Sequence, residues 1–570
     1  MKKILSPVIV FCGAFLATLL LQKNSFVLQE YDGLFLLSPD YFAAMFRTPF
    51  PISGIIGDFL TQFFRFGVYA PLIISAGVTL AFLMLRSILR RLVGTVAGSG
   101  KSSRTGFSVE EVDGQKNRGC KSAGAILSSD LIPAVLSCAL WVIIAFAPTA
   151  RRGVAVVLIL FVVWALVQLL FHPSGARLGE NVPDETVSDA SGAKKGQNVA
   201  GKAVSVALGA KTGGNAPGKA NSANLGAKSP QNEPGSRWLL PFWVNVVGTL
   251  VLVGATFLSL ALNGKVKERE NNATLRVAAV MSDWDRVLAI ATPERAAADP
   301  DVMPYAFLAL GEKGRLGSEL FKYPVQSPDD FDFGLSEENE VRYYFNSILY
   351  QTLQCPNEAI HSDFQLATYE AHGQSFLVLR RLLSNYYQIG NYELARKYAA
   401  VLSRSTLHGQ YARYFTESMA SGTPREPDSL AFRKVVPLIT RDELSNLIML
   451  GAGGINAPAA VDRVLCLLLL QRDMERFQAI FTSVRDRYTS PQGNGSARGT
   501  SIPRYYEEAL MTLGLTDGVS EQTRQRYADF QLDTMSLPVA QLRKLYGDTF
   551  WLYYMSSPDN ATDILPSLDF

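Results

Sequence analysis

Long apolar runs occur only in the first half of the chain. The run at 238–262 has no charged residue over about 25 positions, enough for a helix to cross the hydrocarbon core of a bilayer. Earlier runs at 4–21, 66–85, 131–148 and 154–171 have the same character. The pattern predicts about five transmembrane helices, with no Asp, Glu, Lys or Arg buried inside them.

After residue 262 the apolar positions recur at helical spacing, and no further run is long enough to span a membrane. The clearest unit is a pair of helices around Gly390. Leu382 and Tyr386 share one face of the first helix, Gly390 ends that helix, and Ala395 and Tyr398 share one face of the second. A small residue such as Ala395 lets two helices approach closely, so this segment is predicted to be a helical hairpin.

The hairpin resembles the middle of a tetratricopeptide repeat, because Gly390, Tyr392 and Ala395 match the G-x-Y-x-x-A core of that repeat. The early Trp and the final Pro of the repeat are absent. Weaker copies of the turn recur at intervals of about 30 to 40 residues, and another follows after a longer, proline-containing gap; they are marked by Trp284, Gly314, Ala359 and Phe477. The resemblance implies an all-α fold in which transmembrane helices precede an α-solenoid of tetratricopeptide-like hairpins.

A polar segment rich in Gly, Ala, Ser, Asn and Lys separates the fourth and fifth apolar runs. It contains almost no aromatic residues and cannot bury enough apolar surface to fold, so it is predicted to be a flexible linker. The chain is therefore expected to contain a membrane domain with four spans (1–172), the linker (173–236), a fifth transmembrane helix (237–262) and a soluble helical-repeat domain (263–570).

Positive charge indicates which way the spans run. Arg86, Arg90 and Arg91 follow the second apolar run, and the loop after them and the linker hold most of the other Lys and Arg residues of this half. Such residues stay on the cytoplasmic side. The C-terminal half is therefore predicted to be extracytoplasmic, provided that residues 24–65, which are expected to form short helices at the outer interface, do not cross the membrane.

The overall charge and the cysteine and histidine content argue against a nucleic-acid partner and a metal site, and they leave the state of two cysteines open. The net charge of +3 is small for 570 residues, so no nucleic-acid partner is expected. No cysteine or histidine pattern has the spacing of a metal site, and His408, like the other histidines, is predicted to be a surface or satisfied residue. Cys355 and Cys466 form either a disulfide or two buried thiols, the commoner fate of isolated cysteines.

Two short motifs resemble sequences that bind nucleotides or carry out catalysis in other proteins. The sequence around Gly100–Lys101–Ser102 has the GKS of a phosphate-binding loop, but Thr95 replaces the first glycine and no strand precedes it, so no nucleotide or other cofactor is expected. Glu30 and Asp32 follow the first span. They resemble the acidic residues that polytopic glycosyltransferases place in their first outer loop, whereas a solvated carboxylate pair is the simpler interpretation.

A resemblance over nearly the whole chain, apart from the linker, comes from several segments together, including SPDYFAAMFRTPFP, MSDWDRVL and LRKLYGDTFWLYYM. These resemble an uncharacterised family of bacterial polytopic membrane proteins, which implies a location in the cytoplasmic (inner) membrane but no activity. The expected function is a helical-repeat scaffold for a protein partner in the cell envelope, and an enzyme is not favoured. The alternative is a membrane glycosyl- or lipid-transferase with Glu30 or Asp32 at its site.

Overall fold

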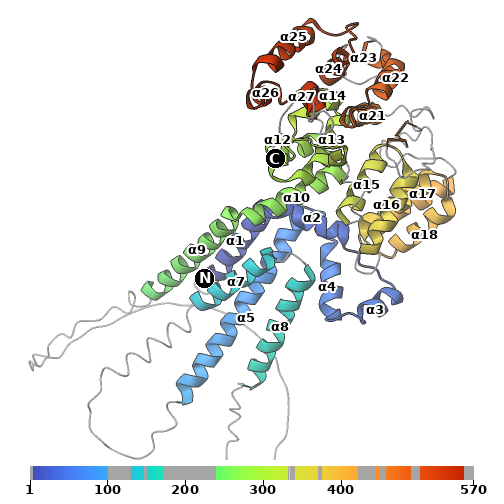
Figure 1. Ribbon diagram of the computed structural model, residues 1–570. Coiled ribbons are helices and arrows are strands. Elements are labelled where there is room, and N and C mark those ends of the chain that lie inside the picture. The colour runs from blue at the N-terminus through green and yellow to red at the C-terminus, as the bar shows by residue number, and fades with distance from the viewer. Residues whose placement is uncertain are drawn as a thin grey trace, which may run out of the picture.

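The computed structural model describes most of both halves of the chain. Figure 1 shows a long bundle of helices that meets a larger, branched group of helices at one end. All elements of the described residues are helices or turns. The described residues are 4–99, 130–146, 150–170, 239–331, 333, 340–369, 375–421, 444–445, 447–448, 458–489 and 501–556.

The bundle is built from the five apolar segments that the sequence singles out, and their helices lie side by side in Figure 1. At 1.5 Å per residue, about 20 residues are needed to cross a bilayer. The helices are α1 (Leu5–Leu21), α5 (Tyr69–Ser99), α7 (Leu131–Phe146), α8 (Ala150–Leu170) and α9 (Leu239–Leu262).

The number of spans is lower than predicted. Among the described residues, three segments are long and apolar enough to cross a membrane: Tyr69–Leu92, Gly153–Leu170 and Trp243–Leu262. A fourth is obtained if α1 and α2 (Lys23–Asp32), which are bent by 75° relative to each other, count as one broken span. α7 is apolar but shorter. The expectation of five therefore becomes three to four.

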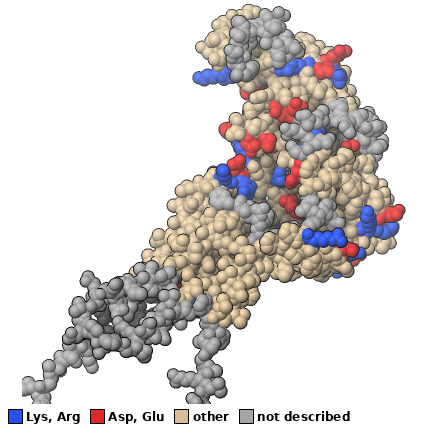
Figure 2. Space-filling view, turned by 60° about the horizontal axis from the view of Figure 1, so that its bottom comes forward, with Lys and Arg blue, Asp and Glu red and all other residues tan. Residues whose placement is uncertain are grey.

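The outer surface of the bundle suits a lipid environment. Large apolar side chains on α8 and α9 are exposed, and Leu169 and Leu262 each keep 76% of their surface accessible. In Figure 2 the described surface of the bundle is almost free of Lys, Arg, Asp and Glu, which gather on the C-terminal half. An exposed apolar surface of this extent indicates contact with a membrane or a partner.

One charged network lies inside the bundle and begins directly after the second predicted span (66–85), whose helix continues through an apolar segment to Leu92. Arg86 lies within the Tyr69–Leu92 segment and is 7% exposed. Its Nε lies 2.7 Å from a carboxylate oxygen of Asp130, which also pairs with Arg90 at 3.2 Å and accepts a hydrogen bond from Ser6. Pairing makes the buried charges tolerable. The network joins α1, α5 and the start of α7 at the end of the bundle remote from the C-terminal half.

Short helices fill most of the segment between α2 and α5, as expected for residues 24–65. α3 (Pro39–Met45) begins after Ser38, whose side chain accepts a hydrogen bond from the backbone N–H of Tyr41 and so caps the helix. α4 (Pro51–Thr61) packs against α8. Their place at the membrane interface stays a prediction.

The C-terminal half consists of helices joined largely by short turns. Its longer helices are mostly 10 to 17 residues in length. They are α10 (Gly264–Val280), α11 (Trp284–Ile290), α12 (Pro293–Ala298), α13 (Met303–Glu312), α14 (Leu316–Glu319), α15 (Glu340–Thr352), α16 (Pro356–Tyr369), α17 (Phe376–Gln388), α18 (Tyr392–Leu402), α19 (Gly409–Ser421), α21 (Pro458–Leu470), α22 (Met474–Val484), α23 (Asp486–Thr489), α24 (Arg504–Thr512), α25 (Glu521–Ser536), α26 (Val539–Tyr546) and α27 (Phe550–Met555).

Six of these turns close in the same way. In each, one residue adopts a left-handed backbone conformation, and the next backbone N–H donates to the carbonyl five residues earlier, at 2.7 to 3.0 Å. This is the hydrogen bond that typically ends a helix. Five of the six turns are those recognised in the sequence, but glycine is not required at all of them. The left-handed residues are Ser282, Gly314, Gln354, Gly390, Arg472 and Gly514.

The hairpins do not stack in one continuous series. α15 to α19 pack against one another in chain order. α13 and α14, in contrast, also pack against α21, and α14 packs against α24 as well. A Cβ on Gly311 of α13 would lie 3.5 Å from that of Ala459 in α21. The described helices therefore do not confirm a single α-solenoid that runs in chain order. Cys355 and Cys466 are separate buried thiols, so the disulfide alternative is excluded.

Candidate functional site

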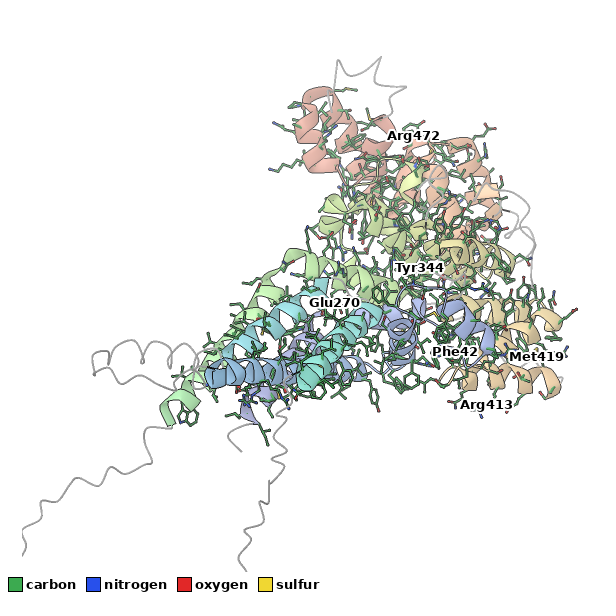
Figure 3. The ribbon with its side chains drawn as sticks, turned by 90° about the horizontal axis from the view of Figure 1, so that it is seen from below. Phe42, Glu270, Tyr344, Arg413, Met419 and Arg472 are labelled. Atoms are coloured by element: carbon green, nitrogen blue, oxygen red, sulfur yellow. The ribbon has the colours of Figure 1, made fainter. Side chains whose placement is uncertain are left out.

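The two halves meet where α2 turns away from α1 and lies against α10. The first N–H groups of a helix have no acceptor inside it. Glu270 of α10 supplies one at the start of α2: its Oε1 accepts from the backbone N–H of Asn24 at 2.8 Å, and its Oε2 accepts from that of Ser25 at 3.0 Å. The side chains of both residues donate to Glu270 as well. Glu270 is labelled in Figure 3, where α10 adjoins the bundle.

A second contact joins the end of α4 to the loop between α18 and α19. The Oε1 atom of Gln62 accepts from the hydroxyl groups of Ser405, at 3.1 Å, and Thr406, at 2.7 Å, and from the backbone N–H of Leu407. Backbone hydrogen bonds between the halves add to this contact: Leu37 donates to Arg404, and Phe376 donates to Gly33. Polar contacts at two separate places therefore hold the helical half on the bundle.

A cavity of about 750 Å³ lies at this junction. Its walls come from α2, residues 65–67, the turn between α10 and α11, and helices α15, α17 and α19. We refer to it as the junction cavity. Segments far apart in the sequence thus enclose one space, and each contributes polar or charged side chains to it.

Positive side chains outnumber negative ones around the junction cavity. Lys23, Arg65, Arg286 and Arg380 line it together with one carboxylate, Glu312. The first three are exposed, whereas Arg380 is half-buried with its guanidinium 5.1 Å from the centre of the Tyr411 ring. Such a set of cations favours an anionic ligand.

A fifth cation of the cavity wall has a structural role. Arg381 is 4% exposed, donates to the Ser347 hydroxyl at 2.9 Å and lies 3.8 Å from the carboxylate of Asp363. Complete burial raises the pKa of Asp363 to about 7, and the nearby guanidinium opposes that shift. Arg381 therefore balances a buried carboxyl group.

Glu30, one of the two acidic residues singled out in the sequence, is closed off from solvent. It is 1% exposed, and its Oε1 lies 3.5 Å from Nε2 of His408, which is itself buried and stacked on the Phe376 ring. α2 packs mainly against α10 and α17 of the helical half, and His408 belongs to the loop between α18 and α19, so the pair lies in the helical half, beyond the end of α1. Burial raises the pKa of Glu30 to about 8, against the opposing effect of Arg65 and Arg380, and lowers the pKa of His408 to about 4. At pH 7 both side chains are uncharged.

Asp32 lies on a different face of α2. Residues two apart on a helix point about 200° apart, and Asp32 lines a second cavity of about 580 Å³ with Arg276 and Tyr305. Its side chain is exposed within this cavity but has protein on most sides, which raises the pKa of Asp32 to about 7. The structure does not bring Glu30 and Asp32 together, and the described residues contain no cluster of three His, Cys, Asp or Glu side chains suited to a metal.

Sequence reasoning missed the residues of the junction cavity. Its five cations come from four segments far apart in the sequence, so no local pattern brings them together. The prediction that His408 is a surface or satisfied residue is wrong, because the side chain is buried and neither ring nitrogen has a hydrogen-bond partner among the described residues. Its neighbour Glu30 is distant in sequence, so no local signal links them. The GKS motif lies outside the described residues.

Comparison with known protein families shows to which family the chain belongs. Residues 1–175 and 205–557 match a family of unknown function, DUF6057. The chain belongs to this family. The match confirms the resemblance seen in the sequence. Searches among curated proteins and among solved structures give no match.

The junction cavity lies within the part of the chain that defines DUF6057. Lys23 and Arg65 fall in the first matched range, and Arg286 and Arg380 fall in the second. The unmatched residues 176–204 all belong to the predicted linker. The two halves that form the cavity are therefore both part of the family's common architecture.

Proposed function

We propose that this member of DUF6057 is a bacterial inner-membrane protein that presents its helical half, on the extracytoplasmic side, as a scaffold for a protein partner. The observation that carries the proposal is the pair of contacts made by Glu270 and Gln62, which fix the helical half on the bundle. A surface of fixed orientation binds with less loss of conformational entropy than a tethered domain does.

The series α15 to α19 supplies suitable side chains for such a partner. Phe364 and Tyr369 of α16 keep 45% and 47% of their surface exposed, and Tyr392 of α18 keeps 39%. Aromatic residues are enriched in protein interfaces, where they contribute much of the binding energy. Repeated helical hairpins also form extended binding surfaces, so a tetratricopeptide-like use of this half is part of the proposal.

The alternative function, a membrane glycosyl- or lipid-transferase, has less support. It would need Glu30 to reach a substrate or metal, but this carboxyl group is 1% exposed and faces His408. Asp32 is accessible, yet it lies in another cavity without the second carboxylate. Replacing Glu30 by Gln and Asp32 by Asn separates the two functions: loss of cellular function with normal folding and partner binding would favour the enzyme.

In-cell crosslinking followed by purification of the full-length protein tests the scaffold. We expect a specific partner to be recovered with the wild type and to be lost when Phe364 and Tyr392 are both replaced by Ser. A matched control replaces Leu532 and Met535 of α25, which are 67% and 87% exposed, by Ser. Equal recovery from all three proteins, or no partner enriched over an unrelated membrane protein, would contradict the proposal.

A further inference from the structure

We propose that the junction cavity binds the phosphate-bearing headgroup of an anionic membrane lipid. This inference rests on placing the bundle in a membrane, which is part of the proposed function, but it does not depend on the scaffold role. It is carried by the charge of the cavity, by its place at the ends of the membrane helices and by the apolar side chains beside it.

The charge and size of the cavity suit a phosphate group. A volume of about 750 Å³ is within the usual range for small-ligand sites. Arg65, Arg286 and Arg380 offer planar guanidinium groups, which bind phosphate oxygens through paired hydrogen bonds, and Lys23 adds a point charge. Glu312 is the one carboxylate of the wall, so a phosphate would meet a net positive surface.

The cavity opens at the level where membrane helices end. Lys23 lies two residues beyond the end of α1, and Gly67 lies two residues before the start of α5. These two residues touch: a Cβ on Gly67 would be 2.8 Å from Cε of Lys23. The ends of spanning helices lie among lipid headgroups, and there Lys and Arg attract anionic lipids.

Exposed apolar side chains on either side of Gly67 in the sequence favour a lipid over a free phosphate. Phe66 and Val68 flank Gly67 in sequence and keep 51% and 52% of their surface exposed. A dissolved phosphate would leave these side chains in water, whereas the acyl region of a lipid would cover them. The same segment therefore offers a cation for the headgroup and apolar contacts for the chains.

Retention of lipid by the full-length protein in neutral detergent tests this site. The probes are phosphatidylglycerol, phosphatidylcholine and inorganic phosphate, and bound lipid is counted by native mass spectrometry. We expect the wild type to retain phosphatidylglycerol in preference to phosphatidylcholine. Replacing Lys23 and Arg65 by Gln should weaken phosphatidylglycerol binding by roughly tenfold to thirtyfold, since each cation near an anionic lipid contributes about 1 kcal/mol.

Two further variants make the result specific. Replacing Arg396 and Arg413 by Gln removes two exposed cations that do not line the cavity, and this control should bind like the wild type; Arg413 lies at the edge of the helical half in Figure 3. Arg286→Gln removes a cavity cation that comes from α11 of the helical half. It should weaken binding even if the Lys23 and Arg65 variant fails to fold.

Three results would overturn the proposal. The first is undiminished phosphatidylglycerol binding by the cavity variants. The second is an equal loss in the control, which would show that surface charge in general attracts the lipid. The third is inorganic phosphate that displaces the lipid completely and binds with the same dependence on Lys23 and Arg65, which would make the site one for dissolved phosphate. None of these results bears on partner capture by the helical half.

Discussion

Replacing Glu30 by Gln should change how the stability of the protein depends on pH. The buried Glu30 carboxyl group faces His408 at 3.5 Å, and neither side chain has a hydrogen-bond partner among the described residues. Glutamine has nearly the same shape as protonated glutamate but cannot release a proton. The substitution therefore keeps the packing and removes the titration.

The sign and size of the effect follow from the two pKa values. The pKa of Glu30 is about 8 in the folded protein and 4.5 as the ordinary value, so between these pH values the folded state holds one more proton than the unfolded state. Stability then falls as pH rises, by about 1.4 kcal/mol per pH unit. The pKa of His408 is lowered from 6.5 to about 4, which gives the opposite slope below pH 6.5 and none above it. Of this pair, only Glu30 changes the slope from pH 6.5 to 8, and over that range it lowers the free energy of unfolding by about 2 kcal/mol.

Thermal unfolding of the full-length protein in detergent at pH 6.5 and pH 8 measures this difference. Asp32, Asp363 and Glu508, whose pKa values are raised to about 7, also titrate in this range, so the informative quantity is the difference between wild type and variant. Between pH 6.5 and pH 8, we expect the free energy of unfolding of the wild type to fall by about 2 kcal/mol more than that of Glu30→Gln. Glu393→Gln, at an exposed position of α18, is the control and should follow the wild type. Parallel pH profiles for wild type and Glu30→Gln would refute the buried pair.

Four further substitutions test particular contacts by the melting temperature of the full-length protein. Gly390→Val should destabilise it by about 1 to 2 kcal/mol, because Gly390 has φ +77° and only open space around it, so the effect comes from the backbone alone. Asn391→Asp should be nearly silent, since either side chain accepts from the Leu394 N–H and caps α18, and a large loss would contradict that cap. Ala395→Leu should lose about 1 to 3 kcal/mol through overpacking, because Ala395 is fully buried; an unchanged melting temperature would mean that the hairpin is not tightly packed. Gln62→Ala should cost about 1 to 3 kcal/mol by leaving the Ser405, Thr406 and Leu407 donors without their acceptor, and no loss would argue against the second contact between the halves.

The local structure of the helical half is readable from sequence because each turn depends on neighbouring residues. The Gly390 turn closes between Asn391 and Tyr386, five residues apart, and helical periodicity marks the helices on both sides. The same signal identifies the turns at Ser282 and Arg472 without a glycine. Which hairpin packs against which is a tertiary property. The contact between Gly311 and Ala459 therefore has no counterpart in the sequence pattern.

The span count and the site depend on contacts that no single segment encodes. The bend after α1 occurs at Gln22, whose side chain donates to the carbonyl of Ala145 in α7, so a hydropathy run that includes α1 cannot reveal it. Glu30 is recognisable as an acidic residue after an apolar run. Its burial against His408 becomes visible only when the α18–α19 loop docks on α2 and α4.

The central claim is that the helical half lies on the extracytoplasmic side of the membrane, and cysteine labelling tests this claim most directly. A single cysteine is placed in a cysteine-free version of the full-length protein, either at exposed Lys397 of α18 or at Ser222 of the linker, which lies outside the described residues. Intact cells with a permeabilised outer membrane are then treated with a thiol reagent that cannot cross the inner membrane. The account predicts labelling at position 397 and protection at position 222. Labelling at 222 with protection at 397 would contradict it and would place the helical half in the cytoplasm.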